Sequence, residues 1–104
     1  MRMKSKIKPV HPGRLLHDEF MEPVGLSQRR LAQATGLSQA HLGNLVRGRL
    51  GITAEVALRL ERALGMSAQS WMNLQTLYDL EMVSVELGKR IRQTTARISL
   101  RAAP

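Results

Sequence analysis

The sequence predicts an all-α domain of five helices, the last of which is longer than the others. Three observations predict this fold class. Aromatic residues are scarce, with one Trp, one Tyr and one Phe, so the core must come from Leu, Ala, Val, Ile and Met, which suit packed helices better than sheets. Apolar residues recur at helical spacing. Glycines, each followed closely by Ser or Thr, divide the chain into segments of helical length.

These glycines predict where helices end, because a residue with positive φ commonly closes a helix. A Ser or Thr shortly afterwards can cap the next helix through its side-chain oxygen. The closing glycines are Gly25, Gly36, Gly48 or Gly51, and Gly65, and the capping residues are Ser27, Ser38, Thr53 and Ser67.

The first helix is expected from about Pro12 to Met21, and Pro12 suits its first turn. The next three are expected over about residues 28–35, 39–47 and 53–64. The fifth begins after Ser67 and fits one continuous apolar stripe. We expect it to fray around Gly88. The stripe is formed by Trp71, Leu74, Tyr78, Met82 and Val85.

The formal net charge of +8 favours a polyanionic partner, and its distribution is uneven. Residues 1–10 form a basic N-terminal arm, and residues 83–104 form a basic extension that we expect to be partly helical or disordered. Residues 11–82, between these two segments, contain most of the predicted helices and form the expected folded domain. Basic tails that only aid solubility are the alternative interpretation.

The absence of cysteine excludes a disulfide framework and a thiolate zinc site. The apolar runs are far shorter than the ~20 residues of a membrane span, and the basic N-terminus has no apolar stretch behind it. We therefore expect a cytoplasmic protein with no membrane contact.

Residues 27–49 predict a helix-turn-helix. Gly36 supplies the positive φ that the tight turn needs. Ala32 is small enough for the two helices to cross closely, and Leu37 packs beneath the turn. Leu42 and Leu45 hold the second helix against the core. A purely structural helical hairpin is the alternative interpretation.

The outward face of the second helix is typical of a surface that enters the DNA major groove. Such a face needs amides for base edges, small residues for close approach, and no carboxylate near phosphates. Residues 27–49 contain no acid, whereas an ordinary solvated face would mix Glu with Lys. The outward residues are Gln39, Ala40, His41, Gly43, Asn44 and Arg47.

We expect Gln39, Ala40 and Asn44 to contact base edges of double-stranded DNA. His41 lies at the margin of this face, where a base, a phosphate and a partner protein are all open as its contact. Phosphate contacts are expected from the residues that open or follow the two helices. These are Ser27, Gln28, Arg29, Ser38, Arg47 and Arg49. For Arg47 and Arg49, contact with a guanine is the alternative.

One such unit covers a single major-groove face, so specific affinity implies a homodimer on a two-fold operator. The fifth helix is the expected dimer interface, through Trp71, Leu74 and Tyr78. The alternative for Trp71 is packing on the fourth helix.

Three passages resemble the HigA-type antitoxins of toxin–antitoxin systems, which belong to the Xre/Cro-like helix-turn-helix superfamily. The first is His11-Pro12-Gly13-Arg14-Leu15-Leu16. The second runs from Gly51 to Leu60, and the third is the Trp-x-x-Leu-Gln-x-x-Tyr-Asp-Leu pattern of residues 71–80. With the helix-turn-helix they cover roughly residues 11–80. Residues 81–104 depart from the shared pattern.

The resemblance implies a lambda-repressor-like fold and two activities. Such proteins repress their own operon as dimers, and they neutralise a small partner toxin, typically a RelE-like mRNA interferase. It also implies that Gln39, Ala40 and Asn44 match the positions through which the family recognises DNA. The resemblance transfers no toxin-contacting residues.

Two other functions remain open: a stand-alone regulator without a toxin, and an interaction module that does not recognise DNA. An enzyme is not expected, because the sequence contains neither a glycine-rich phosphate loop nor a nucleophile motif. No metal or other cofactor is expected either. The run His17-Asp18-Glu19 is interpreted as a solvated helix face rather than a metal site.

Overall fold

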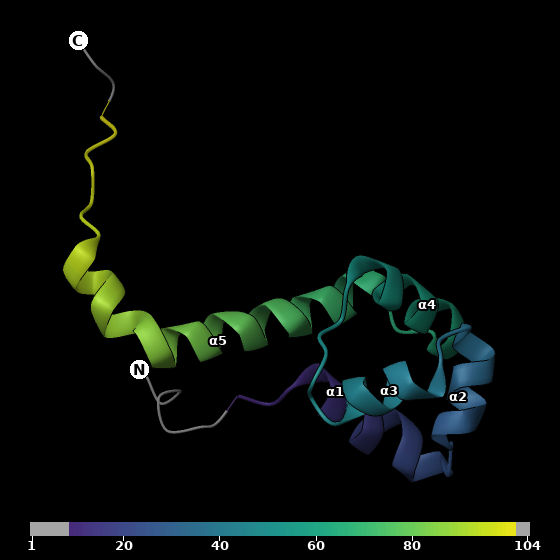
Figure 1. Cartoon of the computed structure of the whole chain (residues 1–104). Coiled ribbons are helices and arrows are strands. Elements are labelled where there is room, and N and C mark those ends of the chain that lie inside the picture. Colours follow the sequence, from purple (N-terminus) through teal and green to yellow (C-terminus); the bar gives the residue numbers. More distant parts are fainter. Residues whose placement is uncertain (1–8, 102–104) are drawn as a thin grey trace.

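The computed structural model describes residues 9–101, so most of the basic arm and the last three residues of the extension lie outside the described residues. Within this range the chain forms helices and no strand, which confirms the predicted all-α fold. The elements are α1 (Pro12–Leu15), the π-helix η2 (Leu16–Met21), the 3₁₀-helix η3 (Glu22–Val24), α2 (Gln28–Thr35), α3 (Gln39–Val46), α4 (Ala54–Leu64) and α5 (Ala68–Thr94) (Figure 1).

Local sequence signals start and stop these helices as predicted. Each of the four predicted capping side chains accepts a hydrogen bond from the backbone N–H three residues later, at 3.0–3.3 Å. Gly25, Gly36 and Gly65 follow η3, α2 and α4 with φ of 67°, 80° and 95°. Of the two candidate glycines after α3, Gly48 has the positive φ, at 78°.

The first predicted helix is not a uniform α-helix. After four α-helical residues it widens into η2, where the N–H of Glu22 donates to the carbonyl of His17 five residues earlier. The wider turn lets both Leu16 and Met21 enter the core. A pattern of apolar spacing does not distinguish this variation from a regular α-helix.

A single hydrophobic core joins η2, α2, α3, α4 and α5. Its largest aromatic side chain, Trp71, is fully buried, and its ring lies 5.2 Å from the ring of Phe20. Ala32 is buried where α2 approaches its neighbours, as expected for a small residue at a close crossing. The remaining buried hydrophobic side chains are Leu16, Met21, Leu31, Leu42, Leu45, Ile52, Val56, Ala57 and Leu60.

Helix α5 has 27 residues and continues past Gly88 to Thr94, so the predicted fraying at Gly88 is wrong. One interior glycine costs only about 0.5–1 kcal/mol relative to alanine, which is too little to end a helix with good helix formers on both sides. The distal half of α5 stands clear of the body (Figure 1), and the molecule measures 59 × 34 × 24 Å. Residues 95–101 have no regular secondary structure.

Among residues 9–101, every helix falls short of the length and apolar character that a membrane span requires.

Candidate nucleic-acid interface

The turn between α2 and α3 is held by Thr35, which sequence reasoning did not single out. Its buried hydroxyl donates to the carbonyl of Leu31 at 2.8 Å and accepts from the N–H of Leu37 at 3.2 Å. The chain can therefore reverse within three residues while its buried polar groups keep their partners. Gly36, at the apex, has φ of 80° as predicted.

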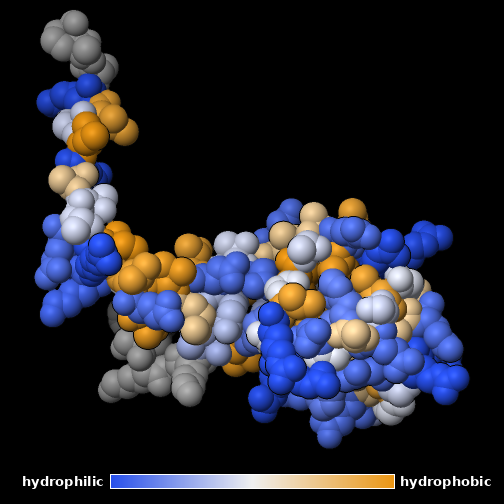
Figure 2. Space-filling view, viewed as in Figure 1, coloured by the Kyte–Doolittle hydropathy of each residue, from blue (hydrophilic) through white to orange (hydrophobic). Residues whose placement is uncertain are grey.

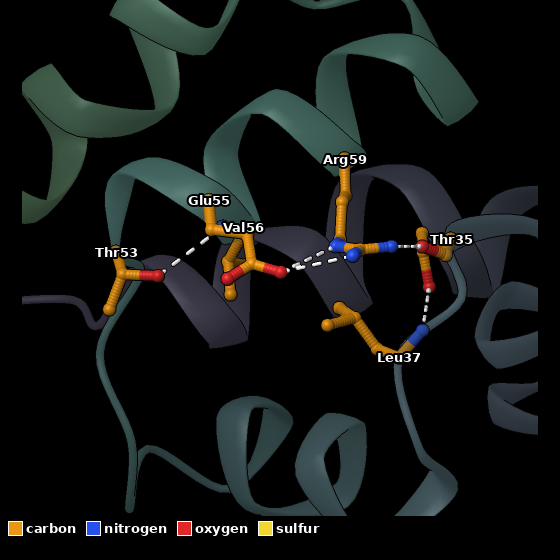
Figure 3. A network of polar contacts seen from close by, with 6 residues as sticks. All are labelled: Thr35, Leu37, Thr53, Glu55, Val56 and Arg59. Carbon is orange, nitrogen blue, oxygen red and sulfur yellow. Dashed lines mark hydrogen bonds and ion pairs between the residues drawn. The ribbon is translucent and has the colours of Figure 1, made fainter.

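Helix α4 fastens this turn from the side. Arg59 donates to the carbonyl of Thr35 at 2.8 Å and pairs with Glu55 at 3.0 Å (Figure 3). A side chain at position 36 would place its Cβ 2.7 Å from the Arg59 guanidinium. Gly36 thus supplies both the turn and the space for Arg59. Because Arg59 is 24 residues from Thr35, no local pattern predicts this contact.

The structure brings the predicted base-contacting residues to one face of α3, with different exposure. Gln39 and Ala40 are exposed, and Asn44 is half-buried. His41 is also half-buried, and its Nε2 atom is buried without a hydrogen-bond partner among the described residues. Gly43 departs from expectation, because it is buried rather than open.

The predicted phosphate contacts lie at the start of α2 and at the two ends of α3. Ser27 and Ser38 are exposed at the helix starts that they cap, and Gln28 beside Ser27 is half-buried. The cationic residues Arg29, Arg47 and Arg49 are exposed. All six predicted residues border the same acid-free stretch of chain.

Two side chains cover Gly43. A Cβ at this position would lie 2.7 Å from Nη1 of Arg47 and 3.4 Å from Nε2 of Gln28. Arg47 therefore folds back over α3 by one turn, and Gln28 approaches it from the start of α2.

Helix α1 abuts the C-terminal end of α3. A Cβ on Gly13 would lie 1.8 Å from the carbonyl oxygen of Leu45, so only glycine permits this approach. His11 caps α1, because its Nδ1 accepts from the N–H of Gly13 at 2.9 Å. Its ring also lies against Gly48 and makes an edge contact with Tyr78 of α5, with ring centroids 4.9 Å apart.

These surroundings lower the pKa of His11. Burial is the main cause, since it disfavours the charged imidazolium. The Asp79 carboxylate and a hydrogen bond with the backbone of Leu50 act in the opposite direction and only partly offset burial. The neutral ring is the form that can accept from Gly13.

A second contact joins α5 to the segment that follows α3. Gln75 is buried, and its side-chain oxygen accepts from the N–H of Ile52 at 2.7 Å. Its amide nitrogen donates to Asp79 at 2.9 Å. The three passages behind the family resemblance therefore meet at one place, behind the end of α3.

The predicted interface residues Trp71, Leu74 and Tyr78 lie on the inner side of α5. Trp71 has no exposed surface, and its ring centroid lies 5.2 Å from that of Phe20, so its place in the core does not fit the expected contact with a partner. Leu74 packs half-buried against the core, and Tyr78 is half-buried against His11. Only the first part of the stripe points inward, because Val85 at its other end is 67% exposed.

Among residues 9–101, one group of possible metal ligands spans η2 and the first residue of η3. Ligand atoms of His17, Asp18 and Glu22 all lie within 4.8 Å of one another, so the π-turn selects Glu22 rather than the adjacent Glu19. The two oxygens of Asp18 already accept from His17 at 2.9 Å and from Arg14 at 3.0 Å. These bonds lower the pKa of Asp18 and account for the group as a surface network of hydrogen bonds.

Comparison with known proteins agrees with this geometry. The helix-turn-helix family matches residues 19–71, from η2 to the start of α5. Virulence-associated protein I of Dichelobacter nodosus is 47% identical over 79 residues, which are 76% of this chain and 73% of that protein. Antitoxin HigA-1 of Vibrio cholerae is 40% identical over 77 residues, which are 74% of this chain and 72% of that protein.

This chain belongs to the HigA family of helix-turn-helix antitoxins.

A solved HigA structure shares the fold over nearly its whole length. It is the Pseudomonas aeruginosa antitoxin HigA with the higBA promoter, which superposes with a TM-score of 0.83 at 38% identity over 88% of this chain and 99% of that one. Membership in the HigA family confirms the resemblance stated on the sequence.

Proposed function

We propose that this HigA-family protein is an antitoxin that represses its own operon by binding operator DNA as a homodimer and that neutralises a small toxin. The observation that carries the DNA-binding half is the exposed, acid-free face of α3, bordered by cationic residues. That the P. aeruginosa relative was solved with its promoter supports the same use of this face. The proposed base contacts are Gln39, Ala40, Asn44 and His41, and the proposed phosphate contacts are Ser27, Gln28, Arg29, Ser38, Arg47 and Arg49.

Toxin neutralisation rests on relatives that are named antitoxins, HigA-1 among them. A RelE-like mRNA interferase is the proposed toxin class, by family resemblance. The proposal is for a cytoplasmic binding protein rather than an enzyme, since the relatives are named as antitoxins and regulators.

Dimerisation is proposed through α5, but through a different face from Trp71. The distal part of α5 carries large apolar side chains that are 43–64% exposed, and they recur at near-heptad spacing with Ser84 between them. Figure 2 shows apolar side chains gathered on the part of α5 that projects beyond the body. The residues are Leu77, Leu80, Leu87 and Ile91. A second copy of this chain is the proposed occupant.

Charge along α5 favours an antiparallel pair. Acidic Asp79 and Glu81 precede Ser84, whereas the basic residues Lys89, Arg90 and Arg92 follow Ser84 and outnumber Glu86 there. Two helices that cross near Ser84 in opposite directions would place the acidic half of each beside the basic half of the other, whereas parallel helices would align like charges. In such a dimer the contact includes Leu77 and Leu80 of the 11–82 domain. It also includes Leu87 and Ile91, which lie at the start of the 83–104 extension.

Operator binding can be tested with a duplex of the region upstream of the gene and a random duplex of equal length. Asn44→Ala or Gln39→Ala should cost about 1–3 kcal/mol on the upstream duplex and much less on the random one. Arg47→Ala should weaken binding to both duplexes. Equal binding of the two duplexes by the unaltered protein would refute operator recognition.

Antitoxin activity can be tested by co-expression with the neighbouring gene. An antitoxin should rescue growth that the neighbour's product arrests, and the two proteins should co-purify in a defined ratio. Operator binding without rescue or co-purification would instead support the stand-alone regulator. Rescue without operator binding would support the interaction module.

A further inference from the structure

Gly43 occupies an unusual position in α3. A glycine in a helix interior destabilises the helix relative to alanine, so its presence calls for a compensating role. Here the missing side chain leaves space that Arg47 occupies, with Nη1 only 2.7 Å from where a Cβ would lie. The main chain of α3 needs no glycine at this point, because α3 is regular and Gly43 lacks the positive φ of a turn glycine.

Two hydrogen-bond donors meet over this glycine. Nε2 of Gln28 lies 3.4 Å from the same Cβ position, so the amide of α2 and the guanidinium of α3 are at most about 6 Å apart. Neither group donates to another side chain or carbonyl within residues 9–101. Two donors that lie this close together, without a hydrogen-bond acceptor among the described residues, suit an anionic oxygen.

The electrostatic surroundings favour an anion at this place. Gln28 is the first residue of α2, whose N-terminus carries a partial positive charge, and the nearest sequence neighbours include Arg29 and Arg30. No acidic residue occurs between Ser27 and Arg49. A DNA phosphate is the anion that the proposed operator complex would supply.

We propose that Gly43 is a positioning residue that holds open a shared seat in which Gln28 and Arg47 bind one backbone phosphate of the operator. This inference rests on the proposed DNA-binding function. In this proposal Gly43 determines how far the Arg47 side chain folds back along α3. The position of the Arg47 guanidinium in turn determines how α3 lies in the DNA major groove. Alanine at 43 displaces the guanidinium, which can move because it ends a flexible side chain, while the 3.4 Å contact with Gln28 is tolerable.

The test is a double-mutant cycle on the full chain with Gly43→Ala, Arg47→Ala and the double variant. Affinity for the upstream duplex, its salt dependence and thermal stability are measured for each. Gly43→Ala should raise Tm by a few degrees, because alanine favours the helix, yet weaken operator binding about three- to tenfold. The slope of log affinity against log salt should fall by about one, since one phosphate contact is lost.

In the Arg47→Ala background, Gly43→Ala should cost less than a further twofold, because the group it displaces is already absent. Additive losses, or full operator affinity in Gly43→Ala, would overturn the proposal. A folding defect would also reduce operator affinity additively, and the thermal stability measured for each variant identifies such a defect. If the unaltered protein does not distinguish the upstream duplex from random DNA, the proposed function fails, which is a separate outcome.

Discussion

The side-chain oxygen of Gln75 accepts a 2.7 Å hydrogen bond from the backbone N–H of Ile52. Ile52 lies between α3 and α4, and Gln75 lies on α5, so this contact ties the segment after α3 to the long helix. Gly51 lets the amide approach, because a Cβ there would lie only 3.1 Å from it.

Replacing Gln75 with Ala should lower the free energy of unfolding by about 1–3 kcal/mol, because the buried N–H of Ile52 loses its acceptor. Urea denaturation at fixed protein concentration measures this change. Gln69→Ala is the matched control on the same helix, since Gln69 is exposed and bonds only to Asn73. Equal effects at the two positions would show that the Ile52 contact contributes nothing.

Gly13→Ala should be the most damaging single methyl addition, because its Cβ would overlap the carbonyl of Leu45 at 1.8 Å. Backbone atoms on both sides must move, and we expect a loss of about 3 kcal/mol or failure to fold. Gly88→Ala is the control, since its nearest neighbours are side-chain ends at 3.4 Å and 3.6 Å. That variant should be neutral or more stable by about 0.5–1 kcal/mol. Denaturation followed by circular dichroism measures the stability of each variant and distinguishes the two.

Stability should fall below pH 6.5 because of His11. Its pKa is lowered in the folded state, so the unfolded chain binds the proton more tightly and protonation favours unfolding. The stabilising contribution is complete above the ordinary value of 6.5 and is lost as the pH falls through the folded-state pKa.

His11→Asn isolates this effect, because asparagine can also cap a helix but does not titrate. The unaltered protein should lose Tm relative to His11→Asn between about pH 7.5 and about pH 5. Asp18 does not interfere, since its pKa is lowered from 3.8 and its contribution disappears only in more acidic solution. Parallel pH profiles of the two proteins would contradict the prediction.

Arg59→Ala should loosen the turn between α2 and α3. It removes the 2.8 Å bond to the carbonyl of Thr35, and we expect a loss of about 1–2 kcal/mol of stability with weaker operator binding. Arg62→Ala on the same helix removes an equal charge without a hydrogen bond to another described residue. If both variants weaken operator binding alike, the effect is one of charge rather than of the turn.

Leu80→Glu should convert the proposed dimer to a monomer, because it places a charge in the apolar face of α5, where Leu80 is 64% exposed. Light scattering coupled to size exclusion reports the mass. Leu58→Glu on α4 is the control, with a similar exposure of 59%. A dimer that survives Leu80→Glu would place the interface elsewhere.

Local features of the fold were predictable because they depend on neighbouring residues. Ser27 and Ser38 cap their helices within three residues, and Gly36 turns the chain where its positive φ was expected. The acid-free face of α3 also follows directly from composition. These local signals are sufficient to place the helix-turn-helix from the sequence.

Long-range contacts were not predictable from the same signals. The bond between Arg59 and Thr35 spans 24 residues, and the bond between Gln75 and Ile52 spans 23. The apolar spacing that includes Trp71 correctly indicated a helix face, but spacing alone does not tell whether that face meets the core or a partner. The side opposite to it, through Leu77 and Leu80, proved to be the exposed one.

The contacts of His11 with Tyr78 and of Gln75 with Ile52 fix the helix-turn-helix to α5 without a flexible hinge between them. In the proposed dimer the distance between two α3 helices is then a fixed property of the protein, not one that a linker can adjust. Inserting one base pair at the centre of the operator would rotate its half-sites by about 34° relative to each other. The dimer would therefore select operators by the spacing of their half-sites, and it would bind poorly to an operator with altered spacing even when both half-site sequences are intact.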